Sequence, residues 1–339
     1  MAEPLVSIII VNWNDAQWIE ACLRSVEQCG YPNLEIIVVD NGSTDDSVRR
    51  VQSIFPRVNL ILNKENTGFA RGNNIGIQAS SGKYVALLNC DTTVAPGWVT
   101  TQVKASEADP TIGICGSKMR LMREPEKLNS VGMVLLPNGL TRHIGDGEVD
   151  HGQYEQPCTI FCVAGAGAFC RREMLDQIGL LDEDFFAYYE DLDLSWRAWL
   201  RGWKCVYVPT AVLYHYRNVT IDQNQSLTWH FRHLNQRNRI WVLLKNFSWG
   251  SLLRLSPTLL AYDVVMTGKG LRAWVTRSRP PVELKARWDA LRGLGRLLKK
   301  RRAIQQTRVM SETEIRALAT TGSLTRRRGV GSSGSGVNS

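Results

Sequence analysis

Four apolar segments rich in β-branched residues recur through the first 90 residues, and each ends at a polar residue. The segments are 6–11, 35–39, 58–62 and 84–88, and the residues that follow them are Asn12, Asp40, Asn63 and Asn89. Stretches with a helical pattern separate them, so strands and helices alternate. Alternation with apolar strands predicts an α/β fold with a mostly parallel sheet covered by helices. Because ligands bind outside the carboxyl ends of such strands, we expect the four polar residues along one binding rim.

Helices are expected over residues 16–29, 45–55, 68–80 and 98–108, and 112–115 is a weaker fifth strand. Residues 120–170 are rich in glycine and predict short antiparallel strands, such as 131–136 and 159–163. Residues 171–178 and 192–201 are typical of helices, and 204–208 is typical of a strand. We therefore expect one catalytic domain over residues 1–220.

The pattern changes after about residue 218. In residues 284–302 Leu and Trp recur every three or four positions, and Lys and Arg fill much of the remainder. This pattern predicts a basic amphipathic helix. From about Thr321 the small and polar composition is typical of disorder. We assign residues 221–305 to a basic amphipathic helical region, and 306–339 to a largely flexible tail.

The distribution of charge sharpens this division. The chain has 339 residues, 44% of them hydrophobic, and a formal net charge of +9. Residues 231–339 hold 22 basic and 5 acidic residues, a net charge of +17, whereas residues 1–230 have a net charge of −8. We expect an acidic catalytic body and a basic region that faces anionic lipid or nucleic acid.

Cysteine spacing and hydropathy indicate the compartment. No two of the eight Cys have CxxC spacing, so a structural zinc site is not expected, and the thiols are typical of reduced, buried residues in a cytosolic protein. The apolar run 6–11 is short and no Lys or Arg precedes it, unlike an export signal. Lys245, Arg254 and Asp263 interrupt the apolar stretch 240–266, so no membrane-spanning helix is expected there.

Two segments along the predicted rim carry residues suited to a phosphorylated ligand. Asp91 lies just beyond a buried strand, where a carboxylate suits a divalent cation that also binds a diphosphate, or simply caps the next helix. Residues 66–76 combine glycines, amides and Arg71, whose guanidinium matches phosphate, although the segment also suits a helix packed on the sheet. The chain lacks GxGxxG after a strand and GxxxxGK[ST], so neither a dinucleotide dehydrogenase nor a P-loop NTPase is supported.

Residues 185–193 form the most informative cluster, with four aromatic residues beside Glu190, Asp191 and Asp193. An aspartate near apolar rings has a raised pKa and suits a general base, and we assign that role to Asp191. Asp193 is interpreted as an acid favoured near a helix N-terminus. His215 follows a strand-like run, and taken alone a single histidine is usually structural.

Five segments, in this order, resemble glycosyltransferase family 2 with its GT-A fold. They are the start of the chain around Ile9 to Asn14, EIIVVDNGS from Glu35, NTGFARGNNIG from Asn66, LLNCDT from Leu87, and the cluster 185–193 followed by Val206 to Pro209. The resemblance extends from Val6 to about His215, and the members most similar to this chain include rhamnosyltransferases of bacterial surface polysaccharides. It implies an inverting transfer from a nucleotide-diphosphate sugar.

The resemblance also implies roles for individual residues. Asn12 and Asp40 would hold the nucleotide base, Arg71 and Asn73 would lie near the base or diphosphate, and Asn89 would lie near the ribose, with Glu190 also on the donor. Asp91 and His215 would bind Mg²⁺ or Mn²⁺, and Asp191 would be the catalytic base. Here the metal motif reads Asn-Cys-Asp where the family pattern is Asp-x-Asp, so an amide replaces the first carboxylate.

We therefore expect a hexosyltransferase that moves rhamnose or another hexose from a dTDP-, UDP- or GDP-sugar to a glycan or lipid-linked glycan. The alternatives are a nucleotidyltransferase or other nucleotide-sugar enzyme, which would release pyrophosphate, and a basic nucleic-acid-binding protein. The Trp and Leu of the basic region follow a helical stripe, which favours an anionic membrane surface over nucleic acid. We expect a cytoplasmic protein bound peripherally to the inner face of the cell membrane, with a homodimer as a further expectation.

Overall fold

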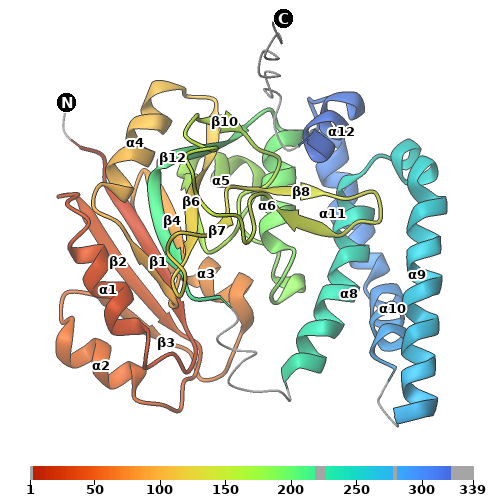
Figure 1. Cartoon of the computed structure of the whole chain (residues 1–339), viewed down its shortest axis with the longest axis horizontal. Helices are drawn as coiled ribbons and strands as arrows, with labels where there is room; N and C mark the ends of the chain where they lie inside the picture. Colours follow the sequence, from red (N-terminus) through yellow and green to blue (C-terminus); the bar gives the residue numbers. More distant parts are fainter. Residues whose placement is uncertain (1–2, 218–226, 278–280, 322–339) are drawn as a thin grey trace, which may run out of the picture.

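The computed structural model describes residues 3–217, 227–277 and 281–321 (Figure 1). Four parallel strands form one half of a ten-stranded sheet, in the order β4-β1-β2-β3. These are the predicted strands: β1 (Val6–Asn12), β2 (Leu34–Asp40), β3 (Asn59–Leu62) and β4 (Tyr84–Asn89). Their register pairs Asn12 with Asp40 and Val11 with Asn89, so the polar strand ends meet at one edge.

The other half of the sheet contains an antiparallel strand that the sequence pattern did not predict. β11 (Gly167–Arg171) lies between β4 and β6 (Ile112–Leu121) and is antiparallel to both. β12 (Lys204–His215) runs parallel to β6, with a register shift between Val208 and Val212. The longest ladders of this mixed sheet are parallel, as expected of an α/β fold.

The six predicted helices of the catalytic domain are all present, with ends within three residues of the predicted ones. They are α1 (Ile19–Glu27), α2 (Ser47–Ile54), α3 (Gly68–Gln78), α4 (Trp98–Ala108), α5 (Arg172–Ile178) and α6 (Glu190–Leu200). α3 packs closely on the sheet, because a Cβ added at Gly76 would lie 2.3 Å from Cγ2 of Ile9 on β1. Seven of the eight Cys are buried and none forms a disulfide, as expected of reduced core thiols.

Short elements fill the region between β6 and α6. They are β5 (Thr92–Val94), β7 (Leu128–Ser130), β8 (Met133–Leu135), β9 (Thr141–His143), β10 (Cys158–Thr159) and the 3₁₀ helix η1 (Glu183–Phe185). The predicted strand 131–136 is wrong in its limits, because Gly132 has a φ of 138° and separates β7 from β8. The predicted strand 159–163 is also wrong: only Cys158 and Thr159 form β10, while Ile160 and Phe161 are buried in the core.

Five helices after residue 226 lie together beside the sheet (Figure 1). They are α8 (Leu227–Asn246), α9 (Trp249–Arg277), α10 (Val282–Arg292), α11 (Leu294–Gln306) and α12 (Glu312–Thr321). The single helix predicted over 284–302 is two helices that meet at Gly293, where a Cβ would lie 2.4 Å from Cζ2 of Trp241 on α8. The indole therefore packs directly on the backbone at this junction.

The segment expected to be a flexible tail is in part helical. α12 occupies residues 312–321, and its Ile315 and Leu318 are buried. Apolar burial therefore orders this stretch, although its sequence is otherwise polar. The rest of the predicted tail, residues 322–339, lies outside the described residues.

Three cations of the basic region point into the protein and not outward. The side chains of Arg239, Lys245 and Arg301 are buried. Arg239 pairs with Asp263, Lys245 pairs with acids of the catalytic domain, and Arg301 donates to backbone carbonyls of α8. No helix in the described ranges is long and apolar enough to span a membrane.

Candidate active site

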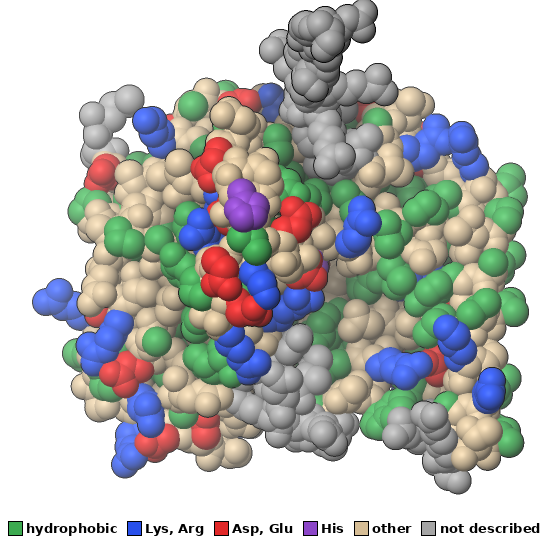
Figure 2. Space-filling view, viewed as in Figure 1, with side chains coloured by type: hydrophobic (Ala, Val, Ile, Leu, Met, Phe, Trp, Pro, Cys, Tyr) green, Lys and Arg blue, Asp and Glu red, His purple; other side chains and the backbone are tan. Residues whose placement is uncertain are grey.

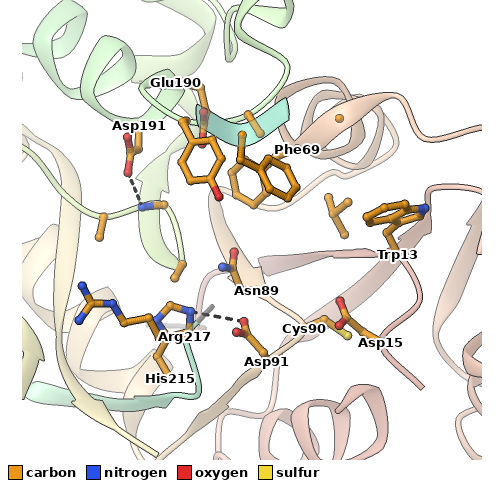
Figure 3. A pocket seen from close by; sticks show the side chains of 18 of the residues that line it. Trp13, Asp15, Phe69, Asn89, Cys90, Asp91, Glu190, Asp191, His215 and Arg217 are labelled. Atoms are coloured by element: carbon orange, nitrogen blue, oxygen red, sulfur yellow. Dashed lines mark hydrogen bonds and ion pairs between the residues drawn. The ribbon is translucent and has the colours of Figure 1, made fainter. Parts of the chain in front are cut away.

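A cavity of about 450 Å³ opens at the edge of the sheet where β1, β4 and β12 end, and we call it the rim cavity. Asn89, Cys90 and Asp91 enter it from the end of β4, and His215 enters from the end of β12. Glu190 and Asp191 enter it from the first turn of α6. Figure 3 shows these two carboxyl groups at one end of the cavity and the Asp91–His215 pair at the other. The sequence thus brings five predicted site residues together.

At the Asp91 end, an imidazole faces a carboxylate. His215 Nε2 lies 3.4 Å from Asp91 Oδ1 (Figure 3), and His215 Nδ1 lies 2.8 Å from Asn129 Oδ1. Because an amide oxygen only accepts hydrogen bonds, Nδ1 donates to Asn129, and Nε2 is the ring nitrogen that faces Asp91. An imidazole nitrogen and a carboxylate oxygen, both common metal ligands, therefore face each other.

Asn89 adds a further oxygen beside this pair. Its Oδ1 is buried and has no hydrogen-bond partner among the described residues. Within those residues, no cluster of three or more His, Cys, Asp or Glu side chains is placed to hold a metal ion. A cation bound here would therefore complete its shell with water or phosphate oxygens, which is how Mg²⁺ is usually held. The carboxylate, amide and imidazole donors fit Mg²⁺ or Mn²⁺ on these terms.

At the opposite end, backbone amides fix the carboxylate of Asp191. Its Oδ2 accepts a hydrogen bond from the N–H of Gly165 at 3.1 Å, and its Oδ1 accepts one from the N–H of Leu192 at 2.7 Å. Burial raises the pKa of Asp191 above its ordinary value of 3.8, although these hydrogen bonds oppose the rise. A carboxylate held in this way is a stronger base than one in water.

Glu190 differs from its neighbour. It is buried, and its Oε2 has no partner in the described part of the chain. Burial, followed by the charge of Asp191, raises the pKa of Glu190 well above its ordinary value of 4.5. Burial therefore disfavours the charged form of Glu190, whose Oε2 has, among the described residues, no hydrogen-bond donors like those that hold Asp191.

The sequence reasoning missed several residues of the rim cavity. Trp13 and Asp15 line it just after β1 (Figure 3), and burial, followed by the charges of Asp91 and Asp45, raises the pKa of Asp15 to about 7. Asp15 follows a strand end by three residues, so the rule that found Asp91 also applies to it. Asn129 lies on β7 with no sequence signal that links it to His215.

Four residues predicted to bind the nucleotide do not line the rim cavity. Asn12 Nδ2 donates to Asp40 Oδ1 at 2.7 Å, and Asp40 Oδ2 also accepts backbone N–H bonds within its own turn. Asn73 is buried and donates to a carbonyl of its own helix. Arg71 is exposed, and its Nε lies 3.9 Å from Oε2 of Glu183. Asn12 and Asp40 shape the turn after β2, and direct nucleotide contacts by all four residues remain predictions.

Comparison with known proteins identifies relatives of this site. An uncharacterised glycosyltransferase of Haemophilus influenzae is 36% identical over 126 residues, which are 36% of this chain and 39% of that protein. An N-acetylglucosaminyl-diphospho-decaprenol L-rhamnosyltransferase of Mycobacterium tuberculosis is 26% identical over 238 residues, which are 63% of this chain and 76% of that protein. The chain thus spans about two fifths of the length of the Haemophilus protein.

A solved structure identifies the fold, and a family model identifies the family. GalNAc-T7, crystallised with UDP, GalNAc and Mn²⁺, superposes with a TM-score of 0.59 at 18% identity, over 71% of this chain and 48% of that one. At this identity the likeness shows the GT-A fold alone. The model of glycosyl transferase family 2 matches residues 7–179, which contain β2 to β4, most of β1, and Asp91. The chain therefore belongs to glycosyltransferase family 2.

Proposed function

We propose that this protein transfers a hexose, rhamnose being the first candidate, from a nucleotide-diphosphate sugar to a hydroxyl of a glycan or lipid-linked glycan, with inversion at the anomeric carbon. The observation that carries the proposal is the opposition of Asp191 to the Asp91–His215 pair across one cavity. A base and a diphosphate site on opposite sides of the sugar suit a single displacement. The rhamnosyltransferase relative supports the sugar and the lipid-linked acceptor.

In this proposal Asp191 accepts the proton of the acceptor hydroxyl as its oxygen attacks the anomeric carbon. The N–H groups of Gly165 and Leu192 hold the carboxylate in one orientation, which favours attack from a single direction. Glu190, whose raised pKa favours the protonated form, would donate a hydrogen bond to a hydroxyl of the bound sugar. Asp91, His215 and Asn89 would hold Mg²⁺ or Mn²⁺, which when bound offsets negative charge on the leaving diphosphate.

Product analysis with a panel of dTDP-, UDP- and GDP-sugars tests this function. We expect release of a nucleoside diphosphate, whereas a nucleotidyltransferase would release pyrophosphate. Asp191→Asn should lower kcat by ~10²–10⁴-fold and leave donor affinity unchanged. Asp176→Asn, at an exposed position on α5, is the matched control and should retain full activity. Turnover by Asp191→Asn within a few-fold of the unmodified enzyme would remove Asp191 from the role of base.

We further propose that the outer face of α9 docks this enzyme on the anionic inner surface of the cell membrane. Exposed apolar side chains follow the length of this face: Leu253, Leu260, Val264, Val265, Trp274 and Val275. Arg254, Lys269 and Arg272 are exposed among them, and Asp263, the single acid in the helix sequence, pairs with Arg239 and Arg287. Figure 2 shows hydrophobic side chains along the edge of the molecule where α9 lies.

An apolar face with cations beside it complements anionic lipid, because each cation near such a surface contributes about 1 kcal/mol to the free energy of binding. We expect the protein to float with phosphatidylglycerol vesicles at low salt, and the double variant Leu260→Asp/Val264→Asp to stay unbound. Leu62→Asp removes a similarly exposed leucine, on β3, and should bind like the unmodified protein. A dimer that the double variant dissociates, without vesicle binding, would instead assign this face to a second copy of the chain.

A further inference from the structure

The backbone that leads into Glu190 and Asp191 has an unusual conformation. Phe186, Tyr188 and Tyr189 have φ angles of 66°, 69° and 71°, in the left-handed region, and none of them is glycine. Each such residue costs on the order of 1 kcal/mol or more and persists only where its surroundings fix it. The segment 184–189, which we call the approach loop, therefore depends on contacts from elsewhere in the fold.

Helix α8 supplies most of these contacts. Asn238 is fully buried, and its Nδ2 lies 2.9, 2.9 and 2.8 Å from the carbonyl oxygens of Phe185, Ala187 and Tyr188. Arg237 donates to the carbonyls of Asp184 and Phe185 at 2.9 and 3.1 Å, and its Nε donates to Asn238 Oδ1. Two adjacent side chains of α8 thus hold four of the six carbonyls of the approach loop, those of residues 184, 185, 187 and 188.

The remaining carbonyls are held from the catalytic domain. The N–H of Ala70 on α3 donates to Phe186 O at 3.0 Å, and the N–H of Asp193 on α6 donates to Tyr189 O at 2.9 Å. Every carbonyl from Asp184 to Tyr189 therefore has a donor, and the donors come from three helices. The aromatic side chains of the approach loop also pack on α8, with Phe186 against His230 and Tyr188 against Phe231.

We infer that Asn238, supported by Arg237, is a positioning residue for the catalytic base. It acts by holding the approach loop in the left-handed conformation that directs Asp191 and Glu190 into the rim cavity. This inference rests on the proposed role of Asp191. It extends the catalytic apparatus to α8, which lies beyond residues 7–179 of the family match.

Two variants of α8 test this inference. Asn238→Leu keeps nearly the same shape and removes the donor. Gln236→Met changes a second buried amide of the same helix, which donates to Tyr262 on α9 and not to the approach loop. We expect Asn238→Leu to lower kcat by about 10–100-fold, because a displacement near 1 Å costs rates of this order, with KM for the donor within about threefold. Gln236→Met should change neither constant.

Hydrogen exchange gives a readout that needs no substrate. Amides of residues 185–191 should exchange faster in Asn238→Leu than in the unmodified protein or Gln236→Met. Unchanged exchange, or faster exchange with an unchanged kcat per folded molecule, would overturn the inference. If Asp191→Asn is inactive and Asn238→Leu is fully active, the inference fails and the proposed base stands. An active Asp191→Asn overturns both.

Discussion

Lys245 is the residue of the C-terminal helices whose removal should destabilise the protein most. Its Nζ lies 2.6 Å from Asp182 Oδ2 and 2.9 Å from Asp193 Oδ2, and its side chain is 3% exposed. The carboxylate of Asp193 is fully buried. Lys245→Met keeps the aliphatic volume and removes the charge, so the change leaves both carboxylates without the cation between them.

The expected loss of stability depends on the partners that the two carboxylates keep in Lys245→Met. Breaking a buried ion pair costs about 3–5 kcal/mol, because one charge stays buried without compensation. Asp193 keeps Arg197 Nε at 2.7 Å and Asn246 Nδ2 at 2.9 Å, and Asp182 keeps Lys300. We therefore expect a loss near the lower end, about 3 kcal/mol in the free energy of unfolding. Lys285→Met is the control, since Lys285 and Asp289 are also 2.9 Å apart but the lysine is 69% exposed, and such pairs contribute under about 0.5 kcal/mol.

The assay is equilibrium unfolding in urea, which does not screen charge as guanidinium chloride does. Burial raises the pKa values of Asp182 and Asp193, but Lys245 and the other cations and hydrogen bonds around the two carboxylates together lower both by more, so each lies below the ordinary 3.8. A depressed pKa stabilises the fold above pH 3.8 and loses that contribution as the pH falls through the folded-state value. The difference in stability between Lys245→Met and the unmodified protein should therefore be fully present at neutral pH and should narrow only as the pH falls below about 3.8. A loss below 1 kcal/mol at pH 7, or one equal to that of Lys285→Met, would refute this reasoning.

Three further outcomes are expected. The raised pKa of Asp191 places the acid limb of kcat/KM above pH 3.8, with activity lost as the pH falls and the base is protonated; a profile without such a limb would contradict this. Asn129→Ala should lower Mn²⁺ affinity by about 10–100-fold in calorimetry, because Asn129 orients His215, and equal affinity would separate His215 from the metal. Gly68→Ala should cost about 1–3 kcal/mol more in urea unfolding than Gly152→Ala. The two φ angles are 85° and 84°, but a Cβ at Gly68 would lie 2.6 Å from Phe186 O, whereas at Gly152 it would meet only Glu155 at 3.7 Å.

The parallel half of the sheet was predictable because its signal is local. Strands β1 to β4 are continuous apolar runs, and burial on both faces of a parallel strand requires such runs. β11 was not predicted because it has only five residues. The residues with which it pairs, on β4 and β6, lie more than 50 positions away in the sequence. The strand predicted over residues 204–208 stops before Pro209, and proline usually ends a strand. Instead the strand passes the proline at a register shift and continues to His215 at the rim.

Prediction of the candidate site was likewise limited to residues with a local sequence signal. Asp91 follows a strand, and Asp191 follows an aromatic run. A short segment of sequence therefore indicates the chemistry of each residue. Asn238 and Asn129 have no such context, and their importance arises only where the chain returns to residues about 50 and 86 positions away. The amphipathic stripe over 284–302 was only partly informative, because Leu297 is buried while Trp288 and Leu291 are exposed. Periodicity predicts a helix, but not whether its apolar side faces the protein or its surroundings.

The dependence of the approach loop on α8 bears on the order of events during synthesis. When the ribosome has released residues 1–220, the chain holds every carboxylate of the rim cavity but not Asn238 or Arg237. The carbonyls of residues 184, 187 and 188 then lack their donors, and that of Phe185 keeps only the N–H of Ala187. Nothing from α8 then maintains the left-handed backbone before Asp191. Under the proposed function, sugar transfer would reach its full rate only after a further helix of the nascent chain has emerged and docked. A fragment truncated at the end of the sheet should therefore turn over more slowly than the full chain, because its carboxylates are synthesised before the helix that positions them.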